Sequence, residues 1–258
     1  AKNYLHRENI FLGKVTAEIK RSAAEIEEPD INLSEQNITD SQLQMLFAIC
    51  CPSIPIEAQI GLALRILCGF GINEIANAFL TNNETISKRL FRAKEKLRTE
   101  KIRIEFPGKT EIDDRLETVL TTLYLLFSEG YYSESNNKIL REDLCTEAMR
   151  LTYMLIENEQ TNLPKVNALY SLMCFHSSRF AARKNEKDEM VLYSDQDESL
   201  WNQELILKGI YFLHEASKGK ELSKYHLEAG IAYWHTIKSD SKEKWDNILQ
   251  LYNKLLQI

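Results

Sequence analysis

Side chains that can contact nucleic acid are concentrated between residues 83 and 105. Eight basic and four acidic residues between 84 and 105 give this segment a net charge of +4, on a chain whose net charge is −6. A cationic segment on an acidic protein is typical of a phosphate-binding element. The alternative is a solvated helix end, where Lys and Arg are favoured by the helix dipole. The candidate DNA contacts are Asn83, Glu84, Thr85, Ser87, Lys88, Arg89, Arg92 and Lys94.

The elements that must position these residues follow from hydrophobic spacing. The period of apolar residues from Glu84 to Arg103 predicts one helix, for which Asn83 is the expected N-cap, with an inward face of Ile86, Leu90, Ala93 and Leu97. Before it we expect a helix that starts at Pro55, has Leu62, Ile66 and Leu67 on its apolar face and ends at Gly69 and Gly71. A two-turn helix then carries Ile75, Ala76 and Phe79. This order predicts a helix-turn-helix whose second helix enters the major groove.

Motifs for other functions are missing from the sequence. The five histidines form no metal-binding pattern, and no Gly-rich phosphate loop or nucleophile elbow is present, so we expect no enzyme, metal or cofactor. Asp195 and Asp197 are interpreted as a helix start, with Asp197 as N-cap. The sequence has five cysteines without a Cys-x-x-Cys pair, no secretory signal and no membrane-spanning run, which favours the cytoplasm. For Cys50 and Cys51 we expect buried thiols rather than a redox or metal-binding role.

We predict an all-α chain in three parts. Residues 1–38 are the end of an N-terminal domain and a linker, residues 39–106 the helix-turn-helix domain, and residues 107–258 a helical extension. Thr39 and Gln42 resemble a capping box that starts the second part. In the third part, helices are expected around Leu116–Gly130, 144–155, 164–180, 201–212, 227–234 and 245–256. Antiparallel helices with short links favour stacked hairpins of the tetratricopeptide type, which bind a partner on one face.

Residues 40–103 resemble the promoter-binding C-terminal domain (region 4) of sigma-70-class initiation factors of bacterial RNA polymerase. The matching stretches are Ile56–Gln59, Ile72–Ala76 and Thr85–Lys94. The whole chain is similar to the extracytoplasmic-function subgroup with a long C-terminal extension, through Phe47–Pro52, Tyr124–Tyr131, Leu144–Ala148, Asp195–Asp197 and Trp201. The chain begins with Ala, and only residues 1 to about 26 are available to represent the end of the family's N-terminal domain and the linker, so we expect a fragment.

The resemblance implies promoter DNA and RNA polymerase core as partners, and the cytoplasm of a bacterium as the location. It places Glu84, Thr85, Lys88 and Arg89 at the upstream promoter element, with Arg92 and Lys94 on phosphates. For Arg89 an ion pair with Glu74 or Glu84 is an equal alternative.

Two other functions stay open. One is a one-component transcription regulator whose extension senses a ligand or a regulatory protein, and the other is a helical-repeat adaptor that binds no DNA. A further hypothesis is that the acidic extension folds over the basic helix and hides it from DNA.

Overall fold

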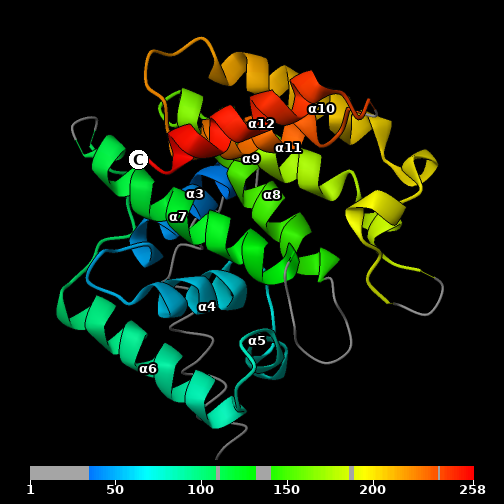
Figure 1. Ribbon diagram of the computed structural model, residues 1–258. Coiled ribbons are helices and arrows are strands. Elements are labelled where there is room, and N and C mark those ends of the chain that lie inside the picture. The colour runs from blue at the N-terminus through cyan, green and yellow to red at the C-terminus, as the bar shows by residue number, and fades with distance from the viewer. Residues whose placement is uncertain (1–34, 109–110, 132–140, 186–188, 238) are drawn as a thin grey trace, which may run out of the picture. The chain divides into compact units, whose positions relative to one another are not determined.

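The structure, a computed structural model, describes residues 35–258 apart from 109–110, 132–140, 186–188 and 238 (Figure 1). The chain divides into two units, Ala1–Ile38 and Thr39–Ile258. Most of the first predicted part, the end of an N-terminal domain and a linker, therefore lies outside the described residues. The architecture below is that of the second unit, together with the helix that leads into it.

The described residues are all-helical, as the sequence predicts. Four helices form the first half: α3 (Glu35–Ile49), α4 (Ile56–Ile66), α5 (Ile72–Ala78) and α6 (Asn83–Thr99). Six follow: α7 (Ile112–Tyr131), α8 (Glu142–Glu157), α9 (Pro164–Ser177), α10 (Gln203–Ala216), α11 (Lys224–Trp234) and α12 (Lys242–Leu255). Within the described ranges, extended pairing is limited to an isolated antiparallel bridge between Lys184 and Met190.

Several predicted helix ends are wrong, because caps are decided by local backbone geometry. The helix α3 begins at Glu35 rather than at a capping box formed by Thr39 and Gln42. The N-cap of α6 is Asn82, whose side chain accepts a hydrogen bond from the backbone N–H of Thr85, so Asn83 is the first helical residue.

The basic helix α6 is shorter than predicted. It ends at Thr99, and Lys101 has a positive φ of 52°, so Lys101 and Arg103 lie beyond the helix. At the end of α4, Ile66 is exposed rather than part of the apolar face, because the buried face of α4 runs from Ala58 to Leu64.

In the second half, two aromatic residues fall outside the helices predicted for them. Phe180 lies in the 3-10 helix Phe180–Arg183 after α9. Trp201 follows the 3-10 helix Glu198–Leu200 and precedes α10. The expected cap is confirmed, since the Asp197 side chain accepts a hydrogen bond from the N–H of Ser199.

Helix α9 is the central helix of the second half and packs against α7, α8, α10 and α11. Its contact with α10 is close at Gly209, where an added Cβ atom would lie 2.6 Å from a ring carbon of Phe175. The hydroxyl of Ser171 donates a hydrogen bond to the Gly209 carbonyl over 2.7 Å. A residue without a side chain thus allows the two backbones to approach.

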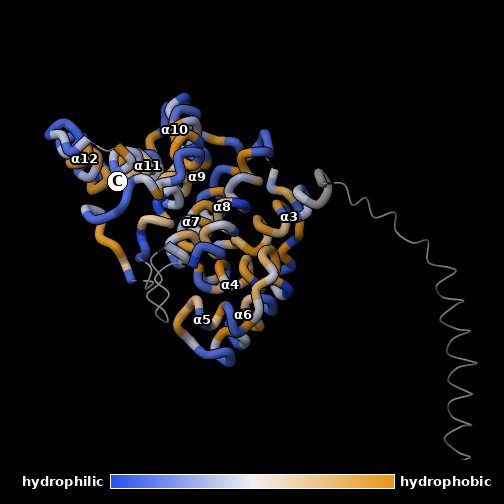
Figure 2. The backbone as a smooth tube through the Cα atoms, turned by 90° about the vertical axis from the view of Figure 1, so that its right-hand side faces the viewer, coloured by the Kyte–Doolittle hydropathy of each residue, from blue (hydrophilic) through white to orange (hydrophobic). Residues whose placement is uncertain are grey.

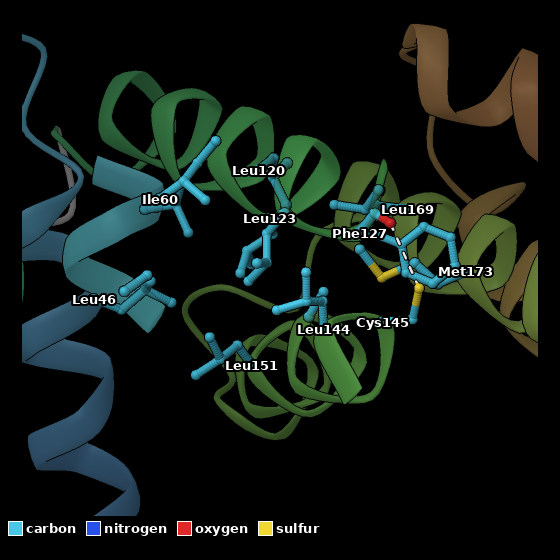
Figure 3. Close-up of a cluster of buried hydrophobic side chains, with 14 of the residues drawn as sticks. Leu46, Ile60, Leu120, Leu123, Phe127, Leu144, Cys145, Leu151, Leu169 and Met173 are labelled. Carbon is cyan, nitrogen blue, oxygen red and sulfur yellow. Dashed lines mark hydrogen bonds between the residues drawn. The ribbon is translucent and has the colours of Figure 1, made fainter. Parts of the chain in front are cut away.

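One hydrophobic core joins the two halves of this unit. Leu46 of α3 and Ile60 of α4 belong to the same cluster of buried side chains as Leu120 and Leu123 of α7 and Leu151 of α8 (Figure 3). In the views of Figures 1 and 2, α5 and α6 lie at one end of this unit and α10 lies at the other end. The helices of the predicted DNA-binding domain are therefore packed directly on the extension.

Buried and half-buried hydrogen bonds also cross this boundary. The buried Gln59 side chain of α4 donates to the carbonyls of Cys51 (2.9 Å) and Ile54 (2.8 Å) and accepts from the Thr122 hydroxyl of α7 (2.9 Å). Arg150 of α8 donates to the carbonyl of Leu67, at the end of α4, over 3.2 Å. Buried polar groups with several partners favour one relative placement of the helices over others.

Candidate nucleic-acid interface

Helix α6 has one buried face and one exposed face, as the sequence predicts. Ile86, Leu90 and Ala93 are buried against the core. The helix is continuous over 17 residues, and Lys88, Arg92 and Lys94 on its other face are exposed. Long basic side chains are therefore held on a rigid element and point away from the core.

The turn between α5 and α6 fixes the start of this helix. The Asn83 amide donates to the side-chain oxygen of Asn73, at a distance of 2.5 Å, and so ties α6 to α5. The Arg89 guanidinium lies over the ring of Phe79, 5.5 Å from its centroid. Asn83 thus has a structural contact of its own, although it was predicted as a DNA contact.

A groove of about 410 Å³ lies between α6 and the start of α4; we call it the basic groove. Its floor is apolar and its α6 side is cationic; it is lined by Ile54, Pro55, Ala58, Thr85, Lys88, Arg89, Arg92, Ala93 and Lys96. Arginine and lysine side chains around a concave surface are suited to phosphate groups.

The cations around the groove differ in their partners. Lys88 forms an exposed ion pair with Glu84 over 2.6 Å, which contributes little stability because both groups are solvated. Lys96 donates a hydrogen bond to the Ser53 carbonyl and braces α6 against the turn before α4. Within the described part of the chain, no carboxylate lies within ion-pair distance of Arg92 or Lys94, so these two cations are available to an anionic partner.

The structure also decides the alternative considered for Arg89. In the described residues, Arg89 makes no ion pair with Glu74 or Glu84, since Glu84 pairs with Lys88 and the Glu74 carboxylate accepts from the N–H of Gly71. Arg89 instead combines the contact with Phe79 and a place in the groove wall.

Four of the predicted contacts are brought together and four are not. Thr85, Lys88, Arg89 and Arg92 line the basic groove, whereas the remaining four lie outside it: Asn83, Glu84, Ser87 and Lys94. The prediction omitted Lys96, which lies one helical turn beyond Arg92, and this spacing alone could have indicated it. It also omitted Pro55, whose place in the groove depends on how α4 packs against α6.

The described residues of the extension do not hide this surface. Helix α6 packs against α4 and α5, and in the presence of those residues Arg89 is partly exposed and the other cationic side chains of α6 are exposed. The hypothesis of an extension folded over the basic helix is therefore not supported for the described residues.

Metal binding, thiol chemistry and membrane insertion were considered for the described residues as well. Among the described residues, no group of three or more His, Cys, Asp or Glu side chains is placed to hold a metal ion. Burial raises the pKa of the Cys50 thiol to about 12, so this group is protonated and unreactive at neutral pH. No described helix has both the length and the apolar composition needed to cross a bilayer.

Comparisons with known proteins match the chain to a family of unknown function and to an uncharacterized protein. Residues 115–217 match a family of unknown function, DUF6596. The chain is 32% identical over 217 residues to the Uncharacterized protein R00370 of Rhizobium meliloti (strain 1021), an alignment covering 84% of this chain. The aligned part spans 51% of that relative, about half its length. A search of solved structures finds no significant match.

Proposed function

We propose that this chain is part of a bacterial transcription initiation factor of the sigma type, which binds promoter DNA through a helix-turn-helix formed by α5 and α6. The observation that carries this proposal is the continuous exposed cationic face of α6, positioned by α4 and α5 beside the basic groove. It would act in the cytoplasm by binding DNA and RNA polymerase core rather than by catalysis.

The start of α6 supports base reading in this proposal, and its middle supports phosphate binding. Thr85 and Lys88 lie in the first two turns of α6, where a recognition helix meets base edges. Lysine can donate to guanine acceptors in the major groove, and the neighbouring Glu84 can accept from a cytosine amino group. Arg92, one turn further on, would contact phosphates and set the position of the protein without specifying sequence.

The helical extension would serve as a structural and regulatory domain of the helical-hairpin, tetratricopeptide-like type. Two features support this assignment: consecutive helices from α7 to α12 pack on one another, and a small residue, Gly209, allows α9 and α10 to approach closely. The core shared between α4 and α7 supports a direct mechanical role for the extension in holding the DNA-binding helices.

DNA binding by the 258-residue chain provides the first test. Fluorescence anisotropy with a random set of labelled duplexes should show an affinity that falls steeply with salt, because cations on α6 displace counterions from phosphates. Arg92→Ala should weaken all duplexes alike and reduce the salt slope by about 1. Lys88→Ala should cost about 1–3 kcal/mol on the preferred sequence and relax the preference at one base.

A matched control is Lys220→Ala, which removes an exposed lysine from the loop after α10, at the opposite end of the unit from α6. This variant should bind DNA as the unmodified chain does. Equal losses in Lys220→Ala and Lys88→Ala would mean that binding reflects net charge only, and the assignment of α6 as the recognition helix would be abandoned.

A second candidate function is a one-component regulator, in which the extension senses a small molecule. A specific observation favours it, namely a cavity in the extension with buried cationic groups, described below. Co-purification of the complete protein with RNA polymerase core separates the two functions. Association with core supports the initiation factor, and DNA binding without such association supports the regulator.

A further inference from the structure

The extension contains a cavity of about 490 Å³ remote from α6. Its walls come from α7, α9, the segment that follows α9, α11 and α12. Segments far apart in the sequence thus converge on one space. A cavity of this volume is within the range of sites for small organic molecules.

Two buried arginines line this cavity. Arg179 and Arg183 each have only 8% of their surface exposed. Among the described residues, the side chain of each arginine makes one hydrogen bond over 3.3 Å: Arg179 donates to the Tyr131 hydroxyl and Arg183 donates to the Tyr131 carbonyl. The Arg183 guanidinium also lies 3.8 Å from the centroid of the Tyr131 ring. Each guanidinium has five N–H donors, so most of their hydrogen-bonding capacity is unused.

These arginines have no anionic partner among the described residues. Buried charges in proteins are normally paired, because desolvation of an isolated ion is costly. The carboxylate that lines the cavity is Glu228, whose pKa is raised by burial, so its charge is disfavoured where it lies. The cavity therefore combines two cations with little compensating negative charge.

Unsatisfied polar atoms are concentrated around the same space. Within the described ranges, four buried side-chain atoms without a hydrogen-bond partner belong to residues of the cavity wall: Arg179 Nε, His176 Nδ1, Gln196 Oε1 and His235 Nδ1. Buried polar atoms usually have partners, so a cluster of unsatisfied ones marks a place prepared for a polar group. One of them belongs to a guanidinium, which suits an oxyanion.

The two histidines contribute hydrogen-bonding atoms rather than charge. Burial, and then the charge of Arg179, lowers the pKa of His176 to about 3 and that of His235 to about 4. Lys244, buried beside His235, acts in the same direction. Both imidazoles are therefore neutral at pH 7, and each presents one donor and one acceptor nitrogen.

Part of the cavity lining is apolar. It includes Phe127 of α7, Leu172 of α9, Ile231 of α11 and Leu255 of α12. A simple inorganic anion would leave these side chains without contacts. An organic molecule that has both an acidic group and a hydrophobic body would contact the arginines and the apolar side chains.

We propose that this cavity binds a small organic anion, with its carboxylate or phosphate group on the guanidinium groups of Arg179 and Arg183 and its apolar body against Phe127, Leu172 and Ile231. This proposal does not depend on the DNA-binding function proposed above. It gives the extension a ligand site of its own.

The test is thermal unfolding of the 258-residue chain at constant ionic strength with four probes: benzoate, phenyl phosphate, inorganic phosphate and uncharged benzyl alcohol. Benzoate or phenyl phosphate at about 100 times its Kd should raise the melting temperature by about 5–10 °C, because it binds only the folded chain. The larger shift of the two identifies the acidic group. Inorganic phosphate should act more weakly, and benzyl alcohol should have no effect.

Three cavity variants and one control connect any shift to the cavity. Arg179→Gln and Arg183→Gln should abolish the shift while melting close to the unmodified chain without ligand, since neither arginine has an ion-pair partner to lose. Arg103→Gln, a matched change at an exposed arginine beyond α6, should keep it. Ile231→Phe, which fills the apolar side and keeps both charges, should abolish the benzoate shift but retain any phosphate shift.

Three results would overturn the proposal. The first is the absence of a shift with all three anions, and the second is an equal shift with benzyl alcohol. The third is an undiminished rise in melting temperature with the anions in either arginine variant. If neither arginine variant folds, an undiminished rise with benzoate in Ile231→Phe has the same meaning.

Discussion

Replacement of Gln59 by Leu should destabilise the whole unit of residues 39–258 rather than the DNA-binding helices alone. Gln59 lies in α4, and its side chain joins the turn before α4 to α7 through three hydrogen bonds. Leu has a similar volume and fills the same space, so the change removes polar contacts with little loss of packing.

The expected magnitude follows from which groups lose their last partner. The Cys51 carbonyl keeps a hydrogen bond from the N–H of Ile54, and the Thr122 hydroxyl can donate to the Thr118 carbonyl over 2.8 Å. The carbonyl of the buried Ile54 residue keeps no hydrogen bond among those of the described residues. One unsatisfied buried carbonyl costs about 1–3 kcal/mol, which is the expected loss in the free energy of unfolding.

The three tryptophans make this prediction specific, because Trp201, Trp234 and Trp245 all lie in the extension. Tryptophan fluorescence therefore reports on the extension, whereas far-UV circular dichroism reports on all helices. Urea unfolding of Gln59→Leu should shift both transitions together, by about 0.5–1 M for a loss of this size. A shift in the midpoint of the fluorescence transition would show that a change in α4 destabilises the extension through the shared core.

The control is Gln250→Leu, which makes the same Gln-to-Leu substitution at an exposed position of α12. It should leave the midpoint almost unchanged. If Gln59→Leu instead produced an early transition by circular dichroism with an unchanged fluorescence transition, the two halves would unfold independently, and the reasoning from a shared core would be refuted.

Three further predictions concern packing, capping and pH. Gly209→Ala should cost about 1–3 kcal/mol in urea unfolding, because its Cβ atom would overlap the ring of Phe175. Asn82→Ala should lower stability by about 1 kcal/mol through loss of the α6 cap, and a smaller loss than in Asn83→Ala would contradict the cap assignment. The pKa of His176 falls to about 3 on folding, so the unfolded chain binds the extra proton, and stability should decrease as pH drops below about 6.5. His176→Gln should reduce the dependence of the free energy of unfolding on pH by about 1 kcal/mol per pH unit, measured by urea titrations between pH 6 and 5.

The sequence predicts the helices of this unit better than their ends. The inward positions Ile86, Leu90 and Ala93 repeat at helical spacing, so α6 and its buried face could be derived without coordinates. Its cap could not, because Asn82 and Asn83 are equally suitable residue types and only the extended backbone at Asn82 decides between them.

Contacts between distant segments were outside the reach of sequence patterns. Gln59 and Thr122 are 63 positions apart, and neither lies in a motif that indicates a partner. The basic groove was half predictable, since Lys88 and Arg92 lie on the same face of one helix, whereas Pro55 enters only through the packing of α4.

The cavity of the extension was missed altogether. His176, Arg179 and Arg183 are close in sequence and look like an ordinary basic end of a helix. Their difference from other basic residues is their burial without acidic partners, which depends on helices α7, α11 and α12 folding around them.

The hydrophobic core shared by the two halves of residues 39–258 bears on any attempt to transplant the DNA-binding helices into another protein. Excision at residue 106 would leave Leu46 and Ile60 facing water where α7 and α8 now cover them, and a chimaera cut there should aggregate. The smallest segment suitable for transfer extends at least to the end of α8 at Glu157. This is because Leu151 of α8 belongs to the shared core and Arg150 donates a hydrogen bond to the Leu67 carbonyl at the end of α4.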